Sequence, residues 1–469
     1  MSEWQAIPYM VIARSPLAIG ERKPGGQFRE SWPYIPGSLV RGAVAEILLR
    51  EAKADHDCDG YHQDNPEQRE SCLFYRTLLG RAPALFGNAY PAPYDGEYHA
   101  PDDGMPQVIP ATAVTCKDRS GFVRHSRSDC RLADEPEPHG VFDTLIDRLC
   151  CEELKPTGIL YHPSCPRYDP ANPQCSGRVD KFTGFYVIRR SGGGSIPFYQ
   201  WLTQKCQPEG AFKFEKTSVP QRILTRVALN RRREVAEEGL LYSPFVLTEG
   251  KRVPGEKGVE YQPSRFVALI WAPKDLADVV RDALEKVDYI GGGASRGLGR
   301  VEVRVTERFA SATVGERLEA FNQVLRKRWE LYKRLGGITE HPYDKGYFFV
   351  IGLQSDAILK RDGWLPTMVL DEEMLREAAR VQDASLKLIR SYATYGYRGG
   401  WQSAWGLPKE VEVTARMGSC YVFWTQDIGL WEPALAQLEI TGVGERRAEG
   451  FGRVRVCDEF HLILREVAR

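Results

Sequence analysis

The sequence lacks any apolar run long enough to span a lipid bilayer, and it shows no secretory signal. These absences predict a cytoplasmic protein with no membrane partner. Net charge is also lacking, because 63 basic and 63 acidic side chains cancel. A surface for nucleic acid must therefore be local, since there is no bulk positive field. The 469 residues, 42% of them hydrophobic, are enough for two or three globular domains.

Cys-x-x-Cys pairs, which are typical of zinc fingers, are missing as well. The eleven cysteines favour thiols or a metal site in a reducing compartment over a disulfide framework. Nine of them fall within residues 53–215, a stretch rich in proline and glycine that we interpret as an insertion. Structural zinc would replace hydrophobic packing there. The predicted ligands are Cys116, Cys151, Cys165 and Cys175, and the alternative is a set of unconnected buried thiols.

A glycine-rich stretch at residues 291–300 lies between a helical pattern at 275–287 and an alternating strand pattern at 301–305. Dinucleotide folds and P-loops have the opposite order, strand then glycines then helix, and no Gly-Lys-Ser/Thr follows here. Glycine lets backbone N–H groups approach a ligand closely. The alternative is an ordinary turn with surface arginines. We predict polyanion contacts from Gly291, Gly292, Gly293, Ser295, Arg296, Gly297 and Arg300.

A similar loop occurs near the C-terminus at residues 442–453. It again follows a helix-like stretch, Trp431–Leu438, and precedes an alternating strand, Val454–Val456. Two loops of this kind indicate a duplicated unit. The predicted contacts of the second loop are Gly444, Arg446, Arg447, Gly450, Gly452 and Arg453.

Two further segments could hold an anion. Ser38 is a suitable N-cap for a helix, and with Arg41 it could bind a phosphate at the helix N-terminus, although every helix begins in some such way. The strand pattern at 222–233 carries several arginines, of which Arg226 and Arg231 are predicted contacts. Nearby aromatic side chains would suit single-stranded nucleic acid. The competing interpretation is a solvated charged strand.

The rest of the chain is interpreted only at the level of helices and strands. The periodicity predicts an opening strand within residues 4–19 and a long helix at 312–335 that packs between the two halves. A second helix is expected at 372–390. Most of the aromatic side chains at 392–405 are expected to pack in a core, although some could stack on bases.

Together these features resemble the RAMP superfamily, the RNA-binding subunits of CRISPR–Cas effectors. The resemblance rests on the Ile35–Gly42 helix start and on the two glycine-rich loops. The C-terminal half, with Tyr347–Leu359, is similar to the large two-RAMP-domain subunit of type III-D complexes. This likeness implies an α+β fold with two ferredoxin-like βαββαβ domains and a Cys/His-rich insertion in the first. The expected boundaries are 1–305 for the first domain, 306–344 for a helical connector and 345–469 for the second domain.

The resemblance also implies a function. Such a subunit holds the 5′ repeat-derived handle of the crRNA beside a polymerase-like large subunit and backbone RAMP subunits, and meets target RNA only indirectly. Nuclease RAMP proteins use an aspartate in the first loop or a histidine, but residues 20–32 contain no aspartate and no histidine precedes His56. We therefore expect a subunit that is not an enzyme. The alternatives are a metal-independent endoribonuclease that processes pre-crRNA or cleaves target RNA, and a nucleic-acid-binding protein outside CRISPR.

Overall fold

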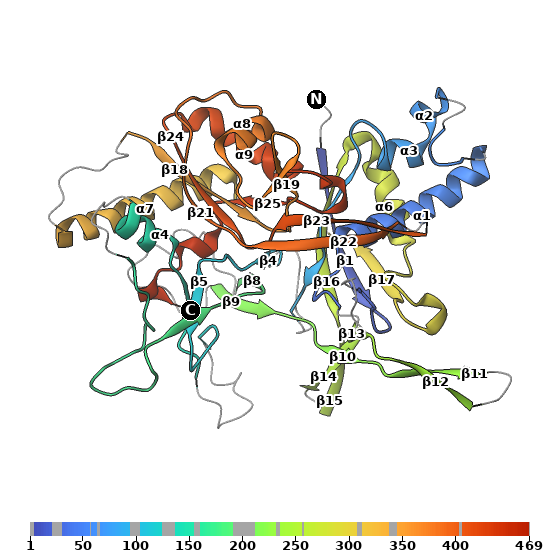
Figure 1. Cartoon of the computed structure of the whole chain (residues 1–469), viewed down its shortest axis with the longest axis horizontal. Coiled ribbons are helices and arrows are strands. Elements are labelled where there is room, and N and C mark those ends of the chain that lie inside the picture. The colour runs from blue at the N-terminus through green and yellow to red at the C-terminus, as the bar shows by residue number, and fades with distance from the viewer. Residues whose placement is uncertain are drawn as a thin grey trace.

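The computed structural model describes thirteen stretches that together make up most of the chain (Figure 1). They are residues 4–20, 31–56, 58–62, 66–93, 104–123, 137–153, 160–190, 212–230, 235–255, 258–306, 312–336, 345–402 and 406–468. Within these stretches no helix has the length and apolar character needed to cross a membrane.

The N-terminal half forms an antiparallel sheet in the order β17-β1-β16-β2, with β3 also paired to β16. Along the chain the order is strand, helix, strand, strand, helix, strand, which is the ferredoxin-like arrangement. The elements are β1 (Trp4–Ala13), α1 (Gly37–His56), β2 (Leu85–Phe86), β3 (Tyr90–Pro91), β16 (Arg265–Pro273), α6 (Ala277–Glu285) and β17 (Val301–Val305).

Strand alternation explains how this sheet meets its helices. Ile7, Tyr9 and Val11 occupy alternate positions of β1 and belong to one buried cluster with Val44 of α1 and Val280 of α6. Side chains at alternate positions point to the same face of a strand. The intervening Met10 packs in a separate small cluster. One face of the sheet is therefore covered by the two helices.

The C-terminal half repeats this topology, with the sheet order β21-β24-β18-β25. Its elements are β18 (Tyr347–Leu353), α8 (Glu372–Ala379), β21 (Lys387–Tyr392), β24 (Cys420–Thr425), α9 (Ile428–Thr441) and β25 (Val454–Val456). The predicted fold class, α+β with two ferredoxin-like domains, is confirmed. The predicted helix at 372–390 is wrong in its second half. Arg380 adopts a left-handed conformation that ends α8, and β21 pairs with β24.

The segment interpreted as an insertion contributes to the N-terminal sheet. β2 and β3 lie within residues 53–215, so the main interruption of the βαββαβ order falls between β3 and β16. Its first part builds two small sheets and two short helical segments. They consist of β4 (Gln107–Val108), β5 (Ala113–Cys116), β6 (Val141–Asp143), α4 (Leu145–Arg148), η2 (Leu149–Glu153), β7 (Val179–Lys181), β8 (Phe185–Arg190) and β9 (Phe212–Thr217).

These elements pack against the C-terminal domain, far along the chain. Phe142 and Tyr186 share one buried cluster with Phe349 and Trp431. Figure 1 shows the same arrangement, with the teal and green strands lying beneath the orange domain. The C-terminal core is thus completed by residues that interrupt the first domain.

The long helix α7 (Val314–Gly336) begins and ends close to its predicted bounds. The prediction that it packs between the halves is wrong. Its buried side chains Leu318, Phe321 and Trp329 belong to the C-terminal cluster, and the Nε of Arg317 donates to the carbonyl of Val456 at 2.9 Å. The helix is therefore part of the C-terminal core.

Short helices and two-stranded ribbons complete the molecule. In Figure 1 the β22–β23 ribbon extends from the C-terminal domain toward α1. The helices are α2 (Gln68–Ser71) and α3 (Leu73–Leu78). The ribbons pair β10 (Gln221–Ile223) with β13 (Phe245–Leu247), β11 (Arg226–Asn230) with β12 (Val235–Tyr242), β14 (Gly250–Gly255) with β15 (Gly258–Pro263), β19 (Leu359–Arg361) with β20 (Leu365–Thr367), and β22 (Tyr395–Gln402) with β23 (Leu407–Ala415).

A buried ion pair joins β6 to the C-terminal domain and makes stability depend on pH. The Nδ1 of His461 lies 3.0 Å from the Oδ2 of Asp143, and both side chains are fully buried. Burial disfavours the charged imidazole, but the Asp143 carboxylate outweighs this and raises the pKa of His461 well above its usual value. A raised histidine pKa stabilises the fold most below the unfolded-state pKa of about 6.5, and the contribution is lost as pH rises through the folded-state pKa.

We therefore expect His461→Gln to lower the melting temperature most at pH 6 and progressively less as pH rises above about 6.5. Thermal unfolding of both proteins at several pH values measures the difference. A deficit that grows with pH would contradict the assignment of a charged His461.

Candidate nucleic-acid interface

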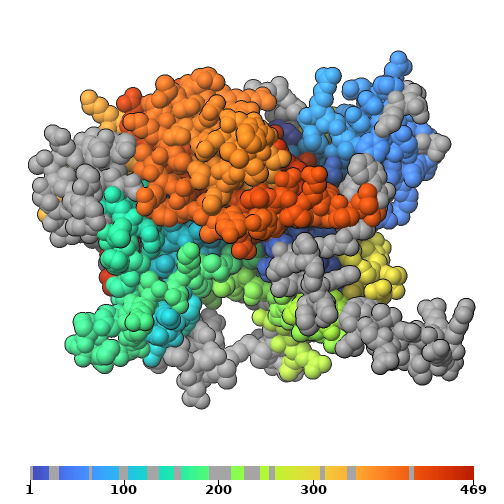
Figure 2. All heavy atoms as spheres, viewed as in Figure 1, coloured from blue at the N-terminus to red at the C-terminus, as the bar shows by residue number. Residues whose placement is uncertain are grey.

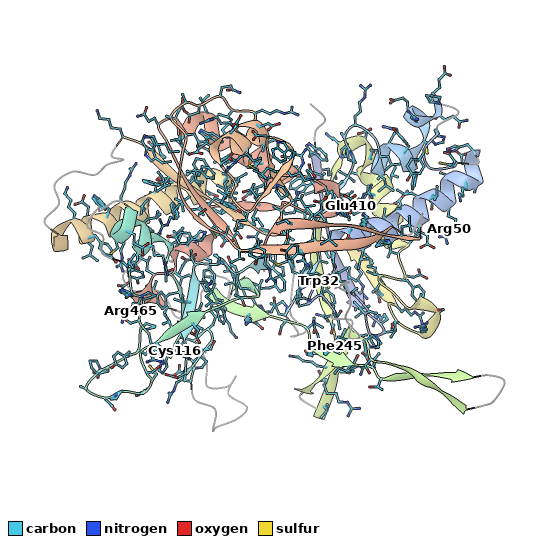
Figure 3. The ribbon with its side chains drawn as sticks, viewed as in Figure 1. Trp32, Arg50, Cys116, Phe245, Glu410 and Arg465 are labelled. Atoms are coloured by element: carbon cyan, nitrogen blue, oxygen red, sulfur yellow. The ribbon has the colours of Figure 1, made fainter. Side chains whose placement is uncertain are left out.

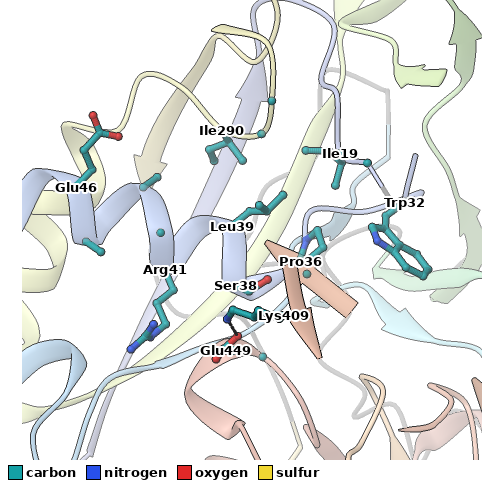
Figure 4. Close-up of a pocket in the computed structure, with 18 of the residues that line it drawn as sticks. Ile19, Trp32, Pro36, Ser38, Leu39, Arg41, Glu46, Ile290, Lys409 and Glu449 are labelled. Carbon is teal, nitrogen blue, oxygen red and sulfur yellow. Dashed lines mark hydrogen bonds and ion pairs between the residues drawn. The ribbon is translucent and has the colours of Figure 1, made fainter. Parts of the chain in front are cut away.

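A cavity of about 1530 Å³ opens where the two domains meet (Figure 4). Its wall includes the start of α1, both glycine-rich loops and the β22–β23 ribbon. In the space-filling view of Figure 2, the orange C-terminal domain extends across to the blue N-terminal domain along this junction. Segments as far apart in the chain as Ala18 and Phe451 thus line one space.

The first loop follows α6 and turns through the single helical turn η4 (Ala294–Arg296). Gly291 has φ of +93°, and a Cβ there would lie 2.8 Å from the carbonyl oxygen of Ala18, so only glycine fits. The N–H of Gly292 donates to that same carbonyl at 3.0 Å. These contacts hold the loop against the segment that follows β1.

The predicted contacts of the first loop divide into two sets. Gly291, Gly292, Gly293 and Arg296 line the cavity, and Arg296 is exposed. The other three predicted residues are absent from the described lining of the cavity: Ser295, Gly297 and Arg300. Arg300 faces a separate hollow that Arg14 and Lys286 also line.

The second loop docks on the N-terminal domain. It contains the helical turn η5 (Arg447–Glu449), and a Cβ on Gly450 would lie 2.8 Å from the carbonyl oxygen of Phe86. Arg446 lies over the ring of Phe451 at 4.9 Å and donates to Glu449 at 2.6 Å. Of the predicted contacts, Arg446 and Gly450 line the cavity.

The other predicted residues of this loop lie elsewhere. Arg447 is exposed but outside the described cavity lining. Arg453 turns inward and donates to the carbonyl of Ile440, and burial lowers its pKa to about 10. Gly444 and Gly452 shape the turn, since a Cβ on Gly452 would lie 1.8 Å from the carbonyl oxygen of Val443. Arg453 therefore supports the turn, and its RNA contact stays a prediction.

Ser38 and Arg41 of α1 both line the cavity. The helix begins at Gly37, so Ser38 lies inside the helix and the prediction of Ser38 as N-cap is wrong. The N–H of Gly37 donates instead to the Oδ1 of Asn88 at 2.9 Å. Arg41 donates to the carbonyl of Leu78 at 2.8 Å, and burial lowers its pKa. Arg41 therefore also supports the end of α3.

The basic ribbon is only partly described. In the backbone register of the β11–β12 ribbon, Arg226 lies opposite Tyr242. Arg231 lies outside the described residues. Phe245, on the neighbouring strand β13, lines the cavity.

Sequence reasoning left three residues of the ribbon β22–β23 unassigned: Tyr397, Arg398 and Lys409. Arg398 lies with its guanidinium 3.3 Å from the ring centre of Trp32, donates to the hydroxyl of Tyr34 at 3.1 Å, and pairs with Asp356. Figure 3 shows Trp32 at the junction of the domains. The sequence signal was Arg398-Gly399-Gly400 among aromatics, but nothing local indicated its partners.

Two of the four acidic residues in the described lining of the cavity are paired with basic side chains. The Nζ of Lys409 lies 2.7 Å from Glu449, as the dashed line in Figure 4 marks. Burial raises the pKa of Glu449, but Arg446 and Lys409 outweigh burial and hold that pKa below its usual value. Asp356 is paired with Arg398 in the same way. The other two acidic residues of the lining, Glu46 and Asp59, are exposed.

A separate group of thiols and an imidazole lies in the insertion, below the C-terminal domain, where Figure 3 labels Cys116. Ligand atoms of Cys116, His139, Cys165 and Cys175 all lie within 4.8 Å of one another. The Nδ1 of His139 is 3.3 Å from the Sγ of Cys165. Three sulfurs and one imidazole at this spacing fit a tetrahedral structural zinc.

Three of the four predicted ligands are brought together, and Cys151 is not among them. Cys151 lies in η2, outside the group, and His139 takes the fourth position. His139 comes just before β6, which pairs with the strand that ends at Cys116. Strand pairing, which has no local sequence signature, therefore selects the histidine.

Comparison with protein-family profiles decides the family. The profile of the RAMP superfamily matches residues 13–302, more than half of the chain. This chain belongs to the RAMP superfamily. The RAMP match runs from the end of β1 to β17, so it spans the first domain with its insertion and first glycine loop. The second domain, outside the matched residues, has the same RAMP-like topology.

Individual relatives are distant. Among curated proteins none matches this RAMP chain. Matching solved structures include a type III-B Cmr-β complex bound to cognate target RNA, at 10% identity and a TM-score of 0.35, covering 88% of this chain and 86% of that chain. Another is a type IV-B CRISPR complex, at 12% identity and a TM-score of 0.22, covering 66% and 93%. At these values the likeness assigns no function.

Proposed function

We propose that this RAMP protein is an RNA-binding structural subunit of a type III CRISPR effector, of the III-D subtype. In that role it holds the 5′ repeat-derived handle of the crRNA. The observation that carries the proposal is the cavity, because both glycine-rich loops and the start of α1 line it.

The size and lining of the cavity suit a single-stranded polymer. Its volume of about 1530 Å³ exceeds the roughly 300–1,000 Å³ of small-molecule pockets. Phe245 and Tyr397 offer aromatic faces, and Tyr397 is 61% exposed. Trp32 and Phe451 also line the cavity, each with an arginine over one face of its ring. Bases stack on such faces while cations and backbone N–H groups hold the phosphates. Arg296 is positioned for the phosphate contact.

We propose further that the protein binds RNA without cleaving it. No histidine occurs in the described lining of the cavity. Of the four acidic residues in that lining, Asp356 and Glu449 are engaged with basic side chains, and Asp59 accepts from the N–H groups of Tyr61 and His62. The fourth, Glu46, is exposed on α1. An uncommitted general base is what RNA cleavage by the 2′-hydroxyl needs. Incubation with repeat RNA tests this point, and products ending in a 2′,3′-cyclic phosphate would favour the endoribonuclease alternative.

The partner RNA is tested by sequencing what co-purifies with the protein from its host. We expect RNAs that share a single repeat-derived 5′ end. A mixture of unrelated cellular RNAs would point to a general nucleic-acid-binding protein. Recovery of a polymerase-like subunit and backbone RAMP subunits in the same complex would support the proposed partners.

Zinc in the group of Cys116, His139, Cys165 and Cys175 is the proposed cofactor. Replacing one ligand removes a bond from a closed tetrahedral site and weakens the local fold. We expect Cys165→Ser to lose one zinc per chain, measured by elemental analysis, and to unfold at a lower temperature. Cys420→Ser, at a buried thiol outside the group, is the control that keeps its metal. A Cys165→Ser protein with unchanged zinc content would contradict the site.

A further inference from the structure

A second group of metal-ligating side chains lies beside the cavity, at the end of α1. Ligand atoms of His56, Cys58, His62 and Cys72 all lie within 4.8 Å of one another. The Sγ of Cys58 is 3.3 Å from the Nε2 of His62 and 3.7 Å from the Sγ of Cys72. Cys58, His62 and Cys72 are at most 5% exposed.

These distances match those around a tetrahedral metal. A zinc ion about 2.3 Å from each sulfur holds two sulfurs about 3.8 Å apart. A disulfide would instead require the two sulfurs at about 2.05 Å. The two cysteines therefore lie at the spacing of thiolates that share an ion.

Neighbouring groups orient the ligands. The N–H of Gly60 donates to the Sγ of Cys58 at 3.3 Å, and the N–H of Tyr75 donates to the Sγ of Cys72 at 3.5 Å. These two N–H groups fix the positions of the two sulfurs. The Nδ1 of His56 bonds to the Oδ2 of Asp55 at 3.0 Å, while its Nε2 is buried and has no hydrogen-bond partner among the residues that the structure describes. A carboxylate on one nitrogen commonly orients the other toward a metal.

We propose that His56, Cys58, His62 and Cys72 hold a structural zinc ion in a closed Cys₂His₂ site, distinct from the site in the insertion. The local packing explains the need for it. The hydrophobic cluster around these residues is small, comprising Ala52, Cys58 and Cys72 with Leu49, Phe74 and Tyr75 at its edge. A metal supplies folding free energy where so little apolar area is buried.

The site also forms a wall of the cavity. Asp59, Gly60 and Tyr61, between two of the ligands, line the cavity, and so do Phe74 and Leu78 of α3. Arg41 bonds to the carbonyl of Leu78. The ion would therefore hold residues 58–62 and 66–78 in the position that completes the cavity. The proposal of a zinc ion here does not depend on whether RNA occupies the cavity.

Elemental analysis of the full-length protein, purified without chelators, tests the proposal. Wild type is expected to carry two zinc ions per chain, one of which is lost in Cys72→Ser. His62→Cys keeps a donor at the same position and is expected to retain both ions, whereas His62→Ala loses one. Combining Cys72→Ser with Cys165→Ser is expected to leave none.

Two results would overturn the second site. One is a wild-type protein whose zinc is lost entirely in Cys165→Ser and unchanged in Cys72→Ser. The other is a disulfide between Cys58 and Cys72, detected by non-reducing peptide mapping of the wild type. This measurement does not depend on whether any variant folds. Loss of RNA binding with both ions in place would count against the proposed function alone.

Discussion

Arg296→Ala is expected to weaken binding of a crRNA handle by about 10-fold or more, since a charge-assisted hydrogen bond contributes roughly 1.5–3 kcal/mol. Arg296 is exposed on the first glycine loop and faces the cavity. Losing one phosphate contact should also lower the slope of affinity against salt concentration by about 0.7. Filter binding or fluorescence anisotropy at several salt concentrations measures both effects.

Arg300→Ala is the matched control. Arg300 is an exposed arginine of the same loop, but it faces the separate hollow with Arg14 and Lys286. Its removal changes the net charge equally, and the affinity should change by less than about 2-fold because screening limits the reach of an exposed charge. Equal losses of RNA affinity in the two variants would mean that the loop acts only through its overall charge. The assignment of the cavity as the RNA-binding site would then be wrong.

Arg398→Met is expected to destabilise the protein by about 3–5 kcal/mol, because it leaves the Asp356 carboxylate buried without its cation. Arg398 is 8% exposed and Asp356 is 4% exposed. Arg398 also contacts Trp32 and Tyr34, so it joins the C-terminal ribbon to the N-terminal domain. A fall of several degrees in the melting temperature, together with weaker RNA binding, is the expected result.

Two further variants separate the ion pair from general damage. Adding Asp356→Leu to Arg398→Met should recover part of the lost stability, since an apolar pair avoids the unpaired charge. Arg361→Ala removes the partner of Asp371 in a pair that is half-exposed, and it should change the melting temperature little. A double variant less stable than Arg398→Met alone would show that Asp356 acts through other contacts, such as the N–H of Met417 that donates to it at 2.7 Å.

Much of the fold could be predicted from local patterns. Alternating residues at 301–305 gave strand β17, and the glycine-rich stretches at 291–300 and 442–453 are loops as expected. The fold class was implied by the resemblance to the RAMP superfamily, and the order of the strands in the two sheets confirms it. The segment 387–390 was mistaken for helix because its pairing with β24 has no local signal.

The sites were less predictable than the fold. Cys116, Cys165 and Cys175 could be proposed from composition, but the structure replaced Cys151 with His139. The group of His56, Cys58, His62 and Cys72 was overlooked because its ligands follow no familiar zinc-finger spacing. Short Cys/His spacings near the end of a helix were the signal that could have indicated it.

By itself, the sequence determined where the chain turns and which family it resembles, because a left-handed turn favours glycine and a half-buried strand alternates apolar and polar residues. Only the tertiary structure decided that Arg296 faces the cavity while Arg300 and Arg453 do not. It also placed α1, both loops and the β22–β23 ribbon around one space. These placements depend on which distant surfaces pack together. Hydrophobic burial drives that packing and is non-directional, so the local sequence does not specify which surfaces meet.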